Sequence, residues 1–308
     1  MRALVTGGAG FVGRLLVSSL VAEGCATWSL DRREGTPPGT TALVADLGDA
    51  DAVERAVRAS RPDLVFHLAS RTPANSPGAT PAQWLGGDPV AAYHLLEAIR
   101  VHAPAARVLV IGSSAVYGPV PAEEMPIAET RPLRPATLYG VTKAAVELAA
   151  LHFHAAHGLF VLGARPFNLV GPGEPPAMLT STLAAQVAAI AAGECAPVVR
   201  MRHRATARDY TDVRDAVRAY RLLLERGVPG EVYNVCSGRA VGIGTLAERL
   251  LAIAGVEASI EETATGPLPG DVATQSGDGS KLAAATGWRP EIPLDESLAA
   301  LLASLRPR

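Results

Sequence analysis

TGGAGFVG, residues 6–13, is the stretch that decides the fold, and it follows directly on the apolar run Ala3-Leu4-Val5. A glycine-rich turn between a short buried strand and a helix is typical of a dinucleotide-binding βαβ unit. The first two glycines can take backbone angles that are closed to residues with a Cβ. Gly10 lets the backbone approach a pyrophosphate, and Gly13 lets the helix pack closely on the strand. The sequence therefore predicts a helix over residues 11–23 whose N-terminal N–H groups and dipole face the phosphates of a dinucleotide.

The end of the second predicted strand indicates which dinucleotide binds. Asp31 follows Trp28-Ser-Leu30 at the tip of that strand. A carboxylate at this point accepts hydrogen bonds from an adenosine ribose diol and repels a 2′-phosphate, which favours NAD. Arg32 and Arg33 follow at once, and an arginine there can hold a 2′-phosphate. We therefore expect NAD, with NADP as the alternative and a solvated loop as the other interpretation of the two arginines.

A second signal lies far downstream of the glycine loop. Tyr139 and Lys143 are spaced i and i+4, so their side chains share one face of a predicted helix over residues 137–157. A free tyrosine has a pKa of about 10 and is a poor base at neutral pH. A nearby ammonium and the positive ring of an oxidised nicotinamide favour the phenolate, so that Tyr139 can exchange a proton with a substrate hydroxyl. Ser113 ends another apolar run, where it can hydrogen-bond the same substrate oxygen. Together with the glycine loop, these residues predict a hydride-transfer enzyme.

The first half of the chain alternates short apolar runs with amphipathic segments. Because the apolar runs are continuous, the strands are buried on both faces, which indicates an α/β fold with a doubly wound parallel (Rossmann) sheet. Further strands are predicted at residues 42–45, 63–67, 107–111 and 159–165, and helices at 49–60, 81–102, 137–157, 180–192 and 212–226.

The pattern changes after about Gly171, where prolines interrupt it. We expect residues 1–170 to form the dinucleotide-binding domain and residues 171–308 to form mainly a smaller substrate-binding lobe. Later segments such as 212–236 are expected to return to the first domain, with residues 232–235 rejoining its sheet. A cleft between the lobe and the strand ends would hold the substrate.

Composition excludes several classes of function. The chain has 308 residues, 48% of them hydrophobic, and its net charge of -2 gives no bulk electrostatic reason to expect nucleic acid or membrane binding. No uninterrupted apolar stretch of about 20 residues exists, so we expect no membrane span. The first strand begins at Arg2, which predicts no signal peptide. The three cysteines and seven histidines lack metal-ligand spacing, so we expect no metal site and a cytoplasmic location.

A set of longer motifs carries a resemblance to a known family. The motifs are MRALVTGGAGFVG (1–13), PDLVFHLAS (62–70), VLVIGSSAVYG (108–118), LYGVTKAAVE (138–147), ARPFNLVGPG (164–173), ARDYTDVRDAVRAY (207–220), GEVYNVCSG (230–238) and TGWRPEIPLDESL (286–298). They resemble those of extended short-chain dehydrogenases/reductases of the NAD-dependent epimerase/dehydratase group, and more narrowly those of GDP-4-keto-6-deoxy-mannose reductases. The resemblance covers nearly the whole chain and implies a nucleotide-sugar substrate.

The resemblance implies a role for individual residues. The catalytic residues would be Ser113, Tyr139 and Lys143, with Lys143 also binding the nicotinamide ribose. The cofactor would be bound by Gly7, Gly10, Phe11, Val12, Gly13, Asp31, Arg32, Asp46, Leu47, Leu68, Ala69, Ser70 and Pro166, in addition to Tyr139 and Lys143. The substrate would be bound by Ser114, Asn168, Arg208 and Asn234. Arg208 suits a diphosphate because a guanidinium makes bidentate contacts to phosphate, and the alternative is a salt bridge to Asp209 or Asp212.

Two positions depart from the family pattern. Asp88 stands where the family usually has an asparagine, which replaces a hydrogen-bond donor with a carboxylate. The stretch at 266–271 lacks an arginine near Leu268 that normally grips the substrate's phosphates. Its absence leaves open a different nucleotide, a substitute arginine, or a substrate without a nucleotide.

Three functions follow from these observations. The first is a 4-keto-6-deoxyhexose reductase, in which hydride passes to C4 and Tyr139 supplies the proton. The second is a nucleotide-sugar 4-epimerase with retained NAD, which Asp31 favours. A dehydratase is less supported, since Ser114-Ala115 offers no acidic residue after the strand-end serine. The third is a non-catalytic dinucleotide sensor, which commonly loses the tyrosine or the lysine.

The resemblance also implies a homodimer. The helices predicted at 81–102 and 137–157 resemble the pair that forms a four-helix bundle between subunits in this family. Small residues at Ala144, Ala145, Ala149 and Ala150 would allow close packing, or would face the sheet instead.

Overall fold

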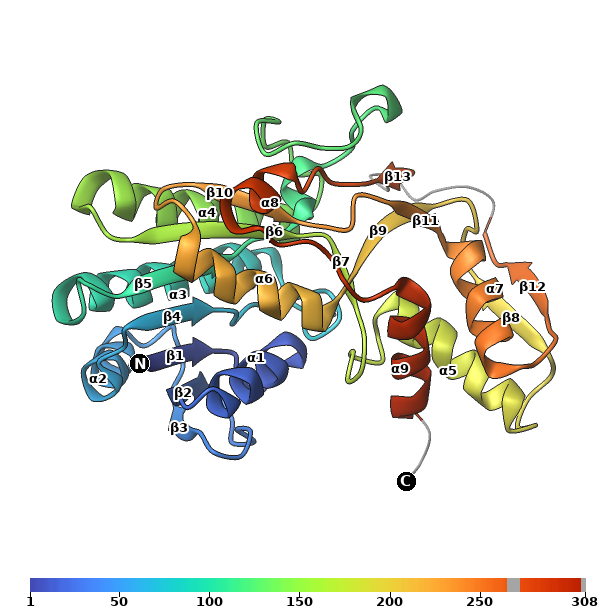
Figure 1. Cartoon of the computed structure of the whole chain (residues 1–308), viewed down its shortest axis with the longest axis horizontal. Helices are drawn as coiled ribbons and strands as arrows, with labels where there is room; N and C mark the ends of the chain where they lie inside the picture. The colour runs from blue at the N-terminus through green and yellow to red at the C-terminus, as the bar shows by residue number, and fades with distance from the viewer. Residues whose placement is uncertain (265–271, 306–308) are drawn as a thin grey trace.

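A computed structural model describes residues 1–264 and 272–305 of the chain. Its centre is a seven-stranded sheet in which all neighbouring strands are parallel (Figure 1). In spatial order the strands are β3 (Thr41–Val44), β2 (Ala26–Asp31), β1 (Arg2–Thr6), β4 (Leu64–His67), β5 (Arg107–Ile111), β6 (Val161–Pro166) and β10 (Val232–Val235). The doubly wound parallel sheet that the apolar runs predict is therefore confirmed.

Helices cover both faces of this sheet (Figure 1). On one face α1 (Phe11–Ala22), α6 (Val213–Arg226) and α8 (Ser280–Thr286) share a core with the strands, and on the other face α2 (Ala50–Ser60), α3 (Pro81–His102) and α4 (Leu138–His157) do so. Successive residues of β4 show the alternation, because Val65 joins the second core and Phe66 the first, and both are fully buried. Two-sided burial is the reason that the strands read as continuous apolar runs.

Several of the helices that cover the sheet begin at side chains that accept hydrogen bonds from their first turns. Asp49 accepts from the Ala52 N–H at 3.1 Å before α2, and Thr137 accepts from the Gly140 N–H at 3.1 Å before α4. Asp212 accepts from the Arg214 N–H at 2.7 Å before α6. Each cap satisfies a backbone donor that the helix itself leaves unpaired, which fixes where the helix starts.

The C-terminal part builds a second, smaller body beside the carboxyl edge of the sheet, at the right of Figure 1. Its helices α5, α7 and α9 pack around a core of Val170, Leu183, Val187, Leu246 and Leu298. The elements are β7 (Asn168–Val170), α5 (Leu179–Ala191), β8 (Val198–Met201), β9 (Ala207–Asp212), β11 (Ala240–Gly242), α7 (Ile243–Ala254), β12 (Ser259–Glu262), β13 (Thr274–Gln275) and α9 (Leu294–Leu305). Within it β9 pairs with β7, β11 and β13, and β8 pairs with β12.

Two short 3₁₀ helices, η1 (Ser114–Tyr117) and η2 (Ala122–Glu124), follow β5. Within residues 1–264 and 272–305, no helix is both long and apolar enough to cross a bilayer. Over the same ranges, no cluster of His, Cys, Asp or Glu side chains could hold a metal ion.

Candidate active site

A cavity of about 700 Å³ lies along the carboxyl ends of the central strands. Ligands of open parallel sheets bind at this edge. Every residue predicted for the catalytic set and the cofactor lines this one cavity, although the residues come from segments far apart in the sequence. They are Gly7, Gly10, Phe11, Val12, Gly13, Asp31, Arg32, Asp46, Leu47, Leu68, Ala69, Ser70, Ser113, Tyr139, Lys143 and Pro166.

The glycine loop forms a cradle that no larger residue could form. Gly7 has a φ of +75°, and a Cβ there would lie 2.8 Å from the Ala69 nitrogen. A Cβ on Gly13 would lie 2.1 Å from the carbonyl oxygen of Gly7. Gly10 caps α1 without a side chain, and no acidic residue stands in the first turn of α1. The N-terminal N–H groups of α1 therefore line the cavity with their positive dipole end, which fits the diphosphate of a dinucleotide.

Asp31 lies at the tip of β2 and lines the same cavity. Its carboxylate accepts a hydrogen bond from the Ser29 hydroxyl at 2.5 Å and lies 3.3 Å from the Ala9 N–H. These contacts fix the carboxylate beside the glycine loop, where an adenosine ribose would lie. Arg32 lines the cavity next to it and is exposed. The donors and acceptors present thus fit the adenosine half of NAD or NADP.

Ser113, Tyr139 and Lys143 meet at the middle of the cavity. Ser113 follows β5 after Gly112 and caps η1, and its hydroxyl hydrogen-bonds Tyr139. The Lys143 ammonium donates to the carbonyl oxygen of Ile111 at 2.8 Å and lies 5.9 Å from the centre of the Tyr139 ring. The i and i+4 spacing on α4 therefore places both side chains at one point of the cavity, beside the end of β5.

The environment of Tyr139 favours its protonated form. Burial raises the pKa of Tyr139, the hydrogen bond with Ser113 lowers it, and the negative charge of Asp88 raises it. Burial also lowers the pKa of Lys143 to about 8, against an opposing contribution from Asp88. The lowering that the sequence led us to expect depends in part on the positive ring of a bound oxidised nicotinamide. In the environment that the protein alone provides, burial outweighs the hydrogen bond. A phenol that keeps its proton is suited to act as an acid.

The four residues predicted for the substrate have different surroundings. Asn168 lines the cavity, at the start of β7. Ser114 is buried, and its hydroxyl donates to Gln275 Oε1 at 3.2 Å. Arg208 donates from Nη1 to the carbonyl oxygen of Ala207 at 2.9 Å and does not line the cavity. The sequence analysis gave a salt bridge to Asp209 or Asp212 as the alternative role of Arg208. Both carboxylates have other partners, since Asp209 accepts a hydrogen bond from the Ser237 hydroxyl and Asp212 pairs with Arg214.

Asn234, which the resemblance assigns to the substrate, does not line this cavity. Its side chain is fully buried, donates to the carbonyl oxygen of Ile127 at 2.8 Å and accepts from the Tyr117 hydroxyl at 2.7 Å. The Tyr117 oxygen in turn accepts from Arg165, whose guanidinium pairs with buried Glu147 at 2.6 Å. Asn234 therefore belongs to a hydrogen-bonded network inside the fold and lies away from the cavity. The position near Leu268, where the family arginine is missing, lies outside the described residues.

Sequence reasoning missed several residues that line the cavity. Arg71 lies in the segment after β4, and Asp88 on α3 was noted only as a departure from a family pattern. Tyr220 on α6 is fully buried against the cavity, and its hydroxyl has no hydrogen-bond partner among the described residues. The sequence showed only that Tyr220 belongs to an amphipathic helix, in a position that is typical of a core residue.

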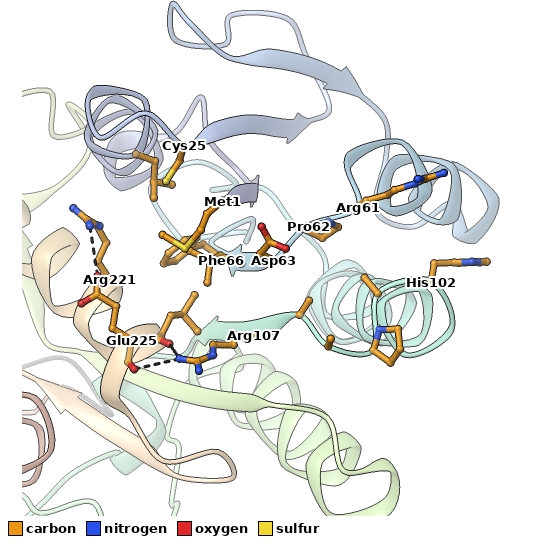
Figure 2. A pocket seen from close by; sticks show the side chains of 17 residues that line it. Met1, Cys25, Arg61, Pro62, Asp63, Phe66, His102, Arg107, Arg221 and Glu225 are labelled. Carbon is orange, nitrogen blue, oxygen red and sulfur yellow. Dashed lines mark hydrogen bonds and ion pairs between the residues drawn. The ribbon is translucent and has the colours of Figure 1, made fainter.

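A second cavity, of about 600 Å³, lies at the amino edge of the sheet (Figure 2). Its floor includes the buried side chains of Phe66 and Leu224. Two of the cations that line it have partners, since Arg107 donates to the Leu224 carbonyl at 2.9 Å and Arg221 pairs with Glu225 at 3.6 Å (Figure 2). None of the predicted site residues lines it, so the cavity at the carboxyl edge is the candidate active site.

Comparisons with known proteins show which proteins the chain is similar to. The family model described as "NAD dependent epimerase/dehydratase family" matches residues 3–236. A GDP-6-deoxy-D-mannose reductase from Pseudomonas aeruginosa is 34% identical over 308 residues, which cover 100% of this chain and 98% of that protein. Among solved structures, RMD from Pseudomonas aeruginosa complexed with NADPH has a TM-score of 0.88 at 32% identity, covering 99% of this chain and 98% of that one. UDP-glucose 4-epimerase from Thermus thermophilus with NAD has a TM-score of 0.87 at 29% identity, with the same coverage.

Proposed function

Because the chain belongs to the NAD-dependent epimerase/dehydratase family of extended short-chain dehydrogenases/reductases, we propose that it is an NAD(P)-dependent reductase of a nucleotide-linked 4-keto-6-deoxyhexose. The observation that carries the proposal is the meeting of Ser113, Tyr139 and Lys143 beside a glycine cradle built for a dinucleotide. The 34% identity to a GDP-6-deoxy-D-mannose reductase over the full chain supports the choice of a sugar nucleotide as substrate.

Each residue of the catalytic set has a task in this reaction. When bound, the reduced cofactor supplies a hydride for C4 of the sugar. Ser113 donates a hydrogen bond to the C4 oxygen and holds it next to the Tyr139 hydroxyl. Tyr139 gives its proton to that oxygen as negative charge develops there. Lys143, held by the Ile111 carbonyl, stabilises the phenolate that remains. Asn168 lies on the second-lobe side of the cavity and contacts the sugar.

A turnover assay with the matched tyrosine variant tests the proposal. Purified protein is incubated with GDP-4-keto-6-deoxy-mannose and NADH or NADPH, and the product is identified by chromatography and mass spectrometry. We expect Tyr139→Phe to reduce turnover at least about 100-fold, the usual scale for loss of a general acid, while cofactor affinity is preserved. Unchanged turnover would refute the role of Tyr139, and no turnover of any nucleotide 4-keto sugar by the wild type would refute the reductase.

A nucleotide-sugar 4-epimerase is the second candidate. Asp31 favours NAD, and a solved UDP-glucose 4-epimerase with NAD shares the fold at a TM-score of 0.87. Native mass spectrometry of freshly purified protein separates the two candidates, because an epimerase recycles its NAD in place. Tightly retained NAD, together with interconversion of UDP-glucose and UDP-galactose, would favour the epimerase. A protein that takes up reduced cofactor only when it is added would support the reductase.

We also propose the division of the chain into two parts. Residues 1–170, with later segments such as 212–236, form the dinucleotide-binding domain, and residues 171–308 form mainly the substrate-binding lobe. The cavity supports this division, because it takes its glycine cradle from the first part and Pro175 and Met178 from the second. Three free cysteines are consistent with a cytoplasmic location, where thiols stay reduced.

The surface of α3 and α4 supports a homodimer. These two helices expose Leu85, Val90, Tyr93, Val101, Leu138, Val141 and Leu148, which are most of the large apolar side chains exposed among the described residues. Such a concentration on one helix pair is typical of an interface, and two copies would form a four-helix bundle. Light scattering should give a dimer mass for the wild type and a monomer mass for Leu148→Arg. Val228→Arg is the matched control, since Val228 is similarly exposed (53% against 57%) but lies after α6. A monomeric wild type would exclude the dimer.

A further inference from the structure

Asp88 on α3 is a buried carboxylate beside the catalytic set. Only 6% of the residue is exposed. Its Oδ2 accepts hydrogen bonds from the Ser70 hydroxyl at 2.5 Å and from the Arg71 N–H at 2.9 Å. Its Oδ1 pairs with the Arg71 guanidinium at 3.5 Å. The carboxylate thus fastens the segment after β4, which forms one wall of the cavity, to α3.

The packing of α3 on α4 places this carboxylate opposite the catalytic pair. Both helices start at the carboxyl edge of the sheet and run the same way (Figure 1). One turn before Asp88, Trp84 packs edge-on against Tyr139 with ring centres 6.2 Å apart. Asp88 and Lys143 each stand one turn further along their helices, on the same faces. Asp88, Arg71, Tyr139 and Lys143 all line the one cavity.

The charged and titratable groups around Asp88 come from three elements. From the segment after β4 comes Arg71, whose side chain is 26% exposed. From α4 come the Lys143 ammonium and the Tyr139 phenol. On β4, His67 is buried and burial lowers its pKa to about 3, so it is neutral and contributes no charge. Among these groups, the Asp88 carboxylate acts directly on Tyr139 and raises its pKa, and Arg71 is the cation paired with that carboxylate.

We propose that the Asp88–Arg71 ion pair is a positioning element for Tyr139 and Lys143, and that the balance of its two charges sets the pH range over which Tyr139 can act as an acid. This role rests on the proposed reductase function. It assigns Asp88 a task that a neutral side chain at this position could not perform, and it makes Arg71 its partner.

The two charges act in opposite directions. The Asp88 carboxylate raises the pKa of Tyr139 and of Lys143, because an adjacent negative charge disfavours the phenolate and favours the ammonium. The Arg71 guanidinium screens that carboxylate. Removing the charge of Asp88 should therefore lower the pKa of Tyr139, and removing the charge of Arg71 should raise it.

A substrate-free titration tests this directly. The ionisation of Tyr139 is followed by ultraviolet difference spectroscopy, with the Tyr139→Phe variant subtracted to remove the other tyrosines. We expect Asp88→Asn to lower the titration midpoint by about 0.5–1 pH unit and Arg71→Met to raise it by a smaller amount. Asp51→Asn, which removes an exposed carboxylate on α2, should leave it unchanged.

The pH profile of kcat/KM supplies the second measurement. Reduction needs protonated Tyr139, so activity falls as pH rises through its pKa, and this alkaline limb should move down in Asp88→Asn and up in Arg71→Met. Opposite shifts in the titration support the proposal even if the substrate assignment is wrong, because no substrate is present. Midpoints that do not move, or that move the same way in both variants, would overturn it. Circular dichroism of each variant checks that folding is intact, and a purely structural role would change thermal stability in both without opposite shifts.

Discussion

Replacing Glu174 with glutamine should stabilise the protein in a strongly pH-dependent way. Glu174 lies in the turn after β7 and is 4% exposed. One carboxyl oxygen accepts a hydrogen bond from the Thr180 hydroxyl, and the other has no partner among the described residues. Burial raises the pKa of this carboxyl from its usual 4.5 to about 7, against an opposing effect of the Thr180 hydrogen bond. The folded protein therefore holds a proton that the unfolded chain releases.

The sign and size of the effect follow from this proton. Between pH 4.5 and about 7 the folded state binds more protons at Glu174 than the unfolded state, so the free energy of unfolding falls as pH rises. This loss in the free energy of unfolding is complete above pH 7 and amounts to about 3 kcal/mol, since each unit of pKa shift corresponds to about 1.4 kcal/mol. Glutamine keeps the shape and the Thr180 hydrogen bond but never ionises. Glu174→Gln should thus leave the free energy of unfolding almost unchanged below pH 4.5 and raise it by about 3 kcal/mol above pH 7.

Chemical denaturation followed by tryptophan fluorescence gives the free energies, for wild type and variant, at one pH below 4.5 and one above 7. His67 also titrates on unfolding, but its contribution cancels in the difference between the two proteins. Glu194→Gln, at an exposed glutamate after α5, is the matched control and should give the same small difference at both pH values. A gain from Glu174→Gln that does not depend on pH, or that is larger in acid, would refute the reasoning.

Three further predictions concern the site and the core. Gly13→Ala puts a Cβ 2.1 Å from the Gly7 carbonyl oxygen, so NADH or NADPH affinity measured by fluorescence titration should fall at least about 10-fold; unchanged affinity would contradict the cradle. Arg165→Met leaves Glu147 buried without its cation and should lower the free energy of unfolding by about 3–5 kcal/mol in a denaturant titration, whereas a loss below about 1 kcal/mol would mean that the pair is dispensable. Asp31→Ser removes the carboxylate that repels a 2′-phosphate, so the ratio of NADPH to NADH affinity should rise about 10-fold, and a constant ratio would exclude this role for Asp31.

The sequence was most informative where one residue type alone satisfies a local requirement. The glycine loop and the i and i+4 pair on α4 each act within a few positions of the chain, so spacing was enough to predict them. The segments predicted at 81–102 and 107–111 agree with α3 and β5 residue for residue. The continuous apolar runs are also short local stretches of the chain, and they predicted that the sheet is buried on both faces.

The sequence was least informative where a side chain depends on distant partners. The Asn234 side chain accepts a hydrogen bond from Tyr117, which lies 117 positions away in the sequence. Nothing in the motif VYNV distinguishes an asparagine in a buried network from one that contacts substrate. The burial that raises the pKa of Tyr139 depends on the packing of α3 against α4, whereas the sequence showed only the lysine one turn away. Asp88 and Arg71 are 17 positions apart, on a helix and on a loop, and their pairing needs the fold to bring them together.

The place of β10 at the edge of the sheet has a consequence for how the protein is made. β10 pairs with β6, yet between them the chain forms β7, α5, β8 and β9 of the second lobe and then α6. Until residue 235 has left the ribosome, β6 presents an unpaired edge and the face that α6 will cover is bare. A nascent or truncated chain that stops near residue 170 therefore exposes surfaces that favour aggregation. A single cut near residue 170 would separate the dinucleotide-binding half from β10 and α6, so we expect that fragment to be less stable than the whole protein.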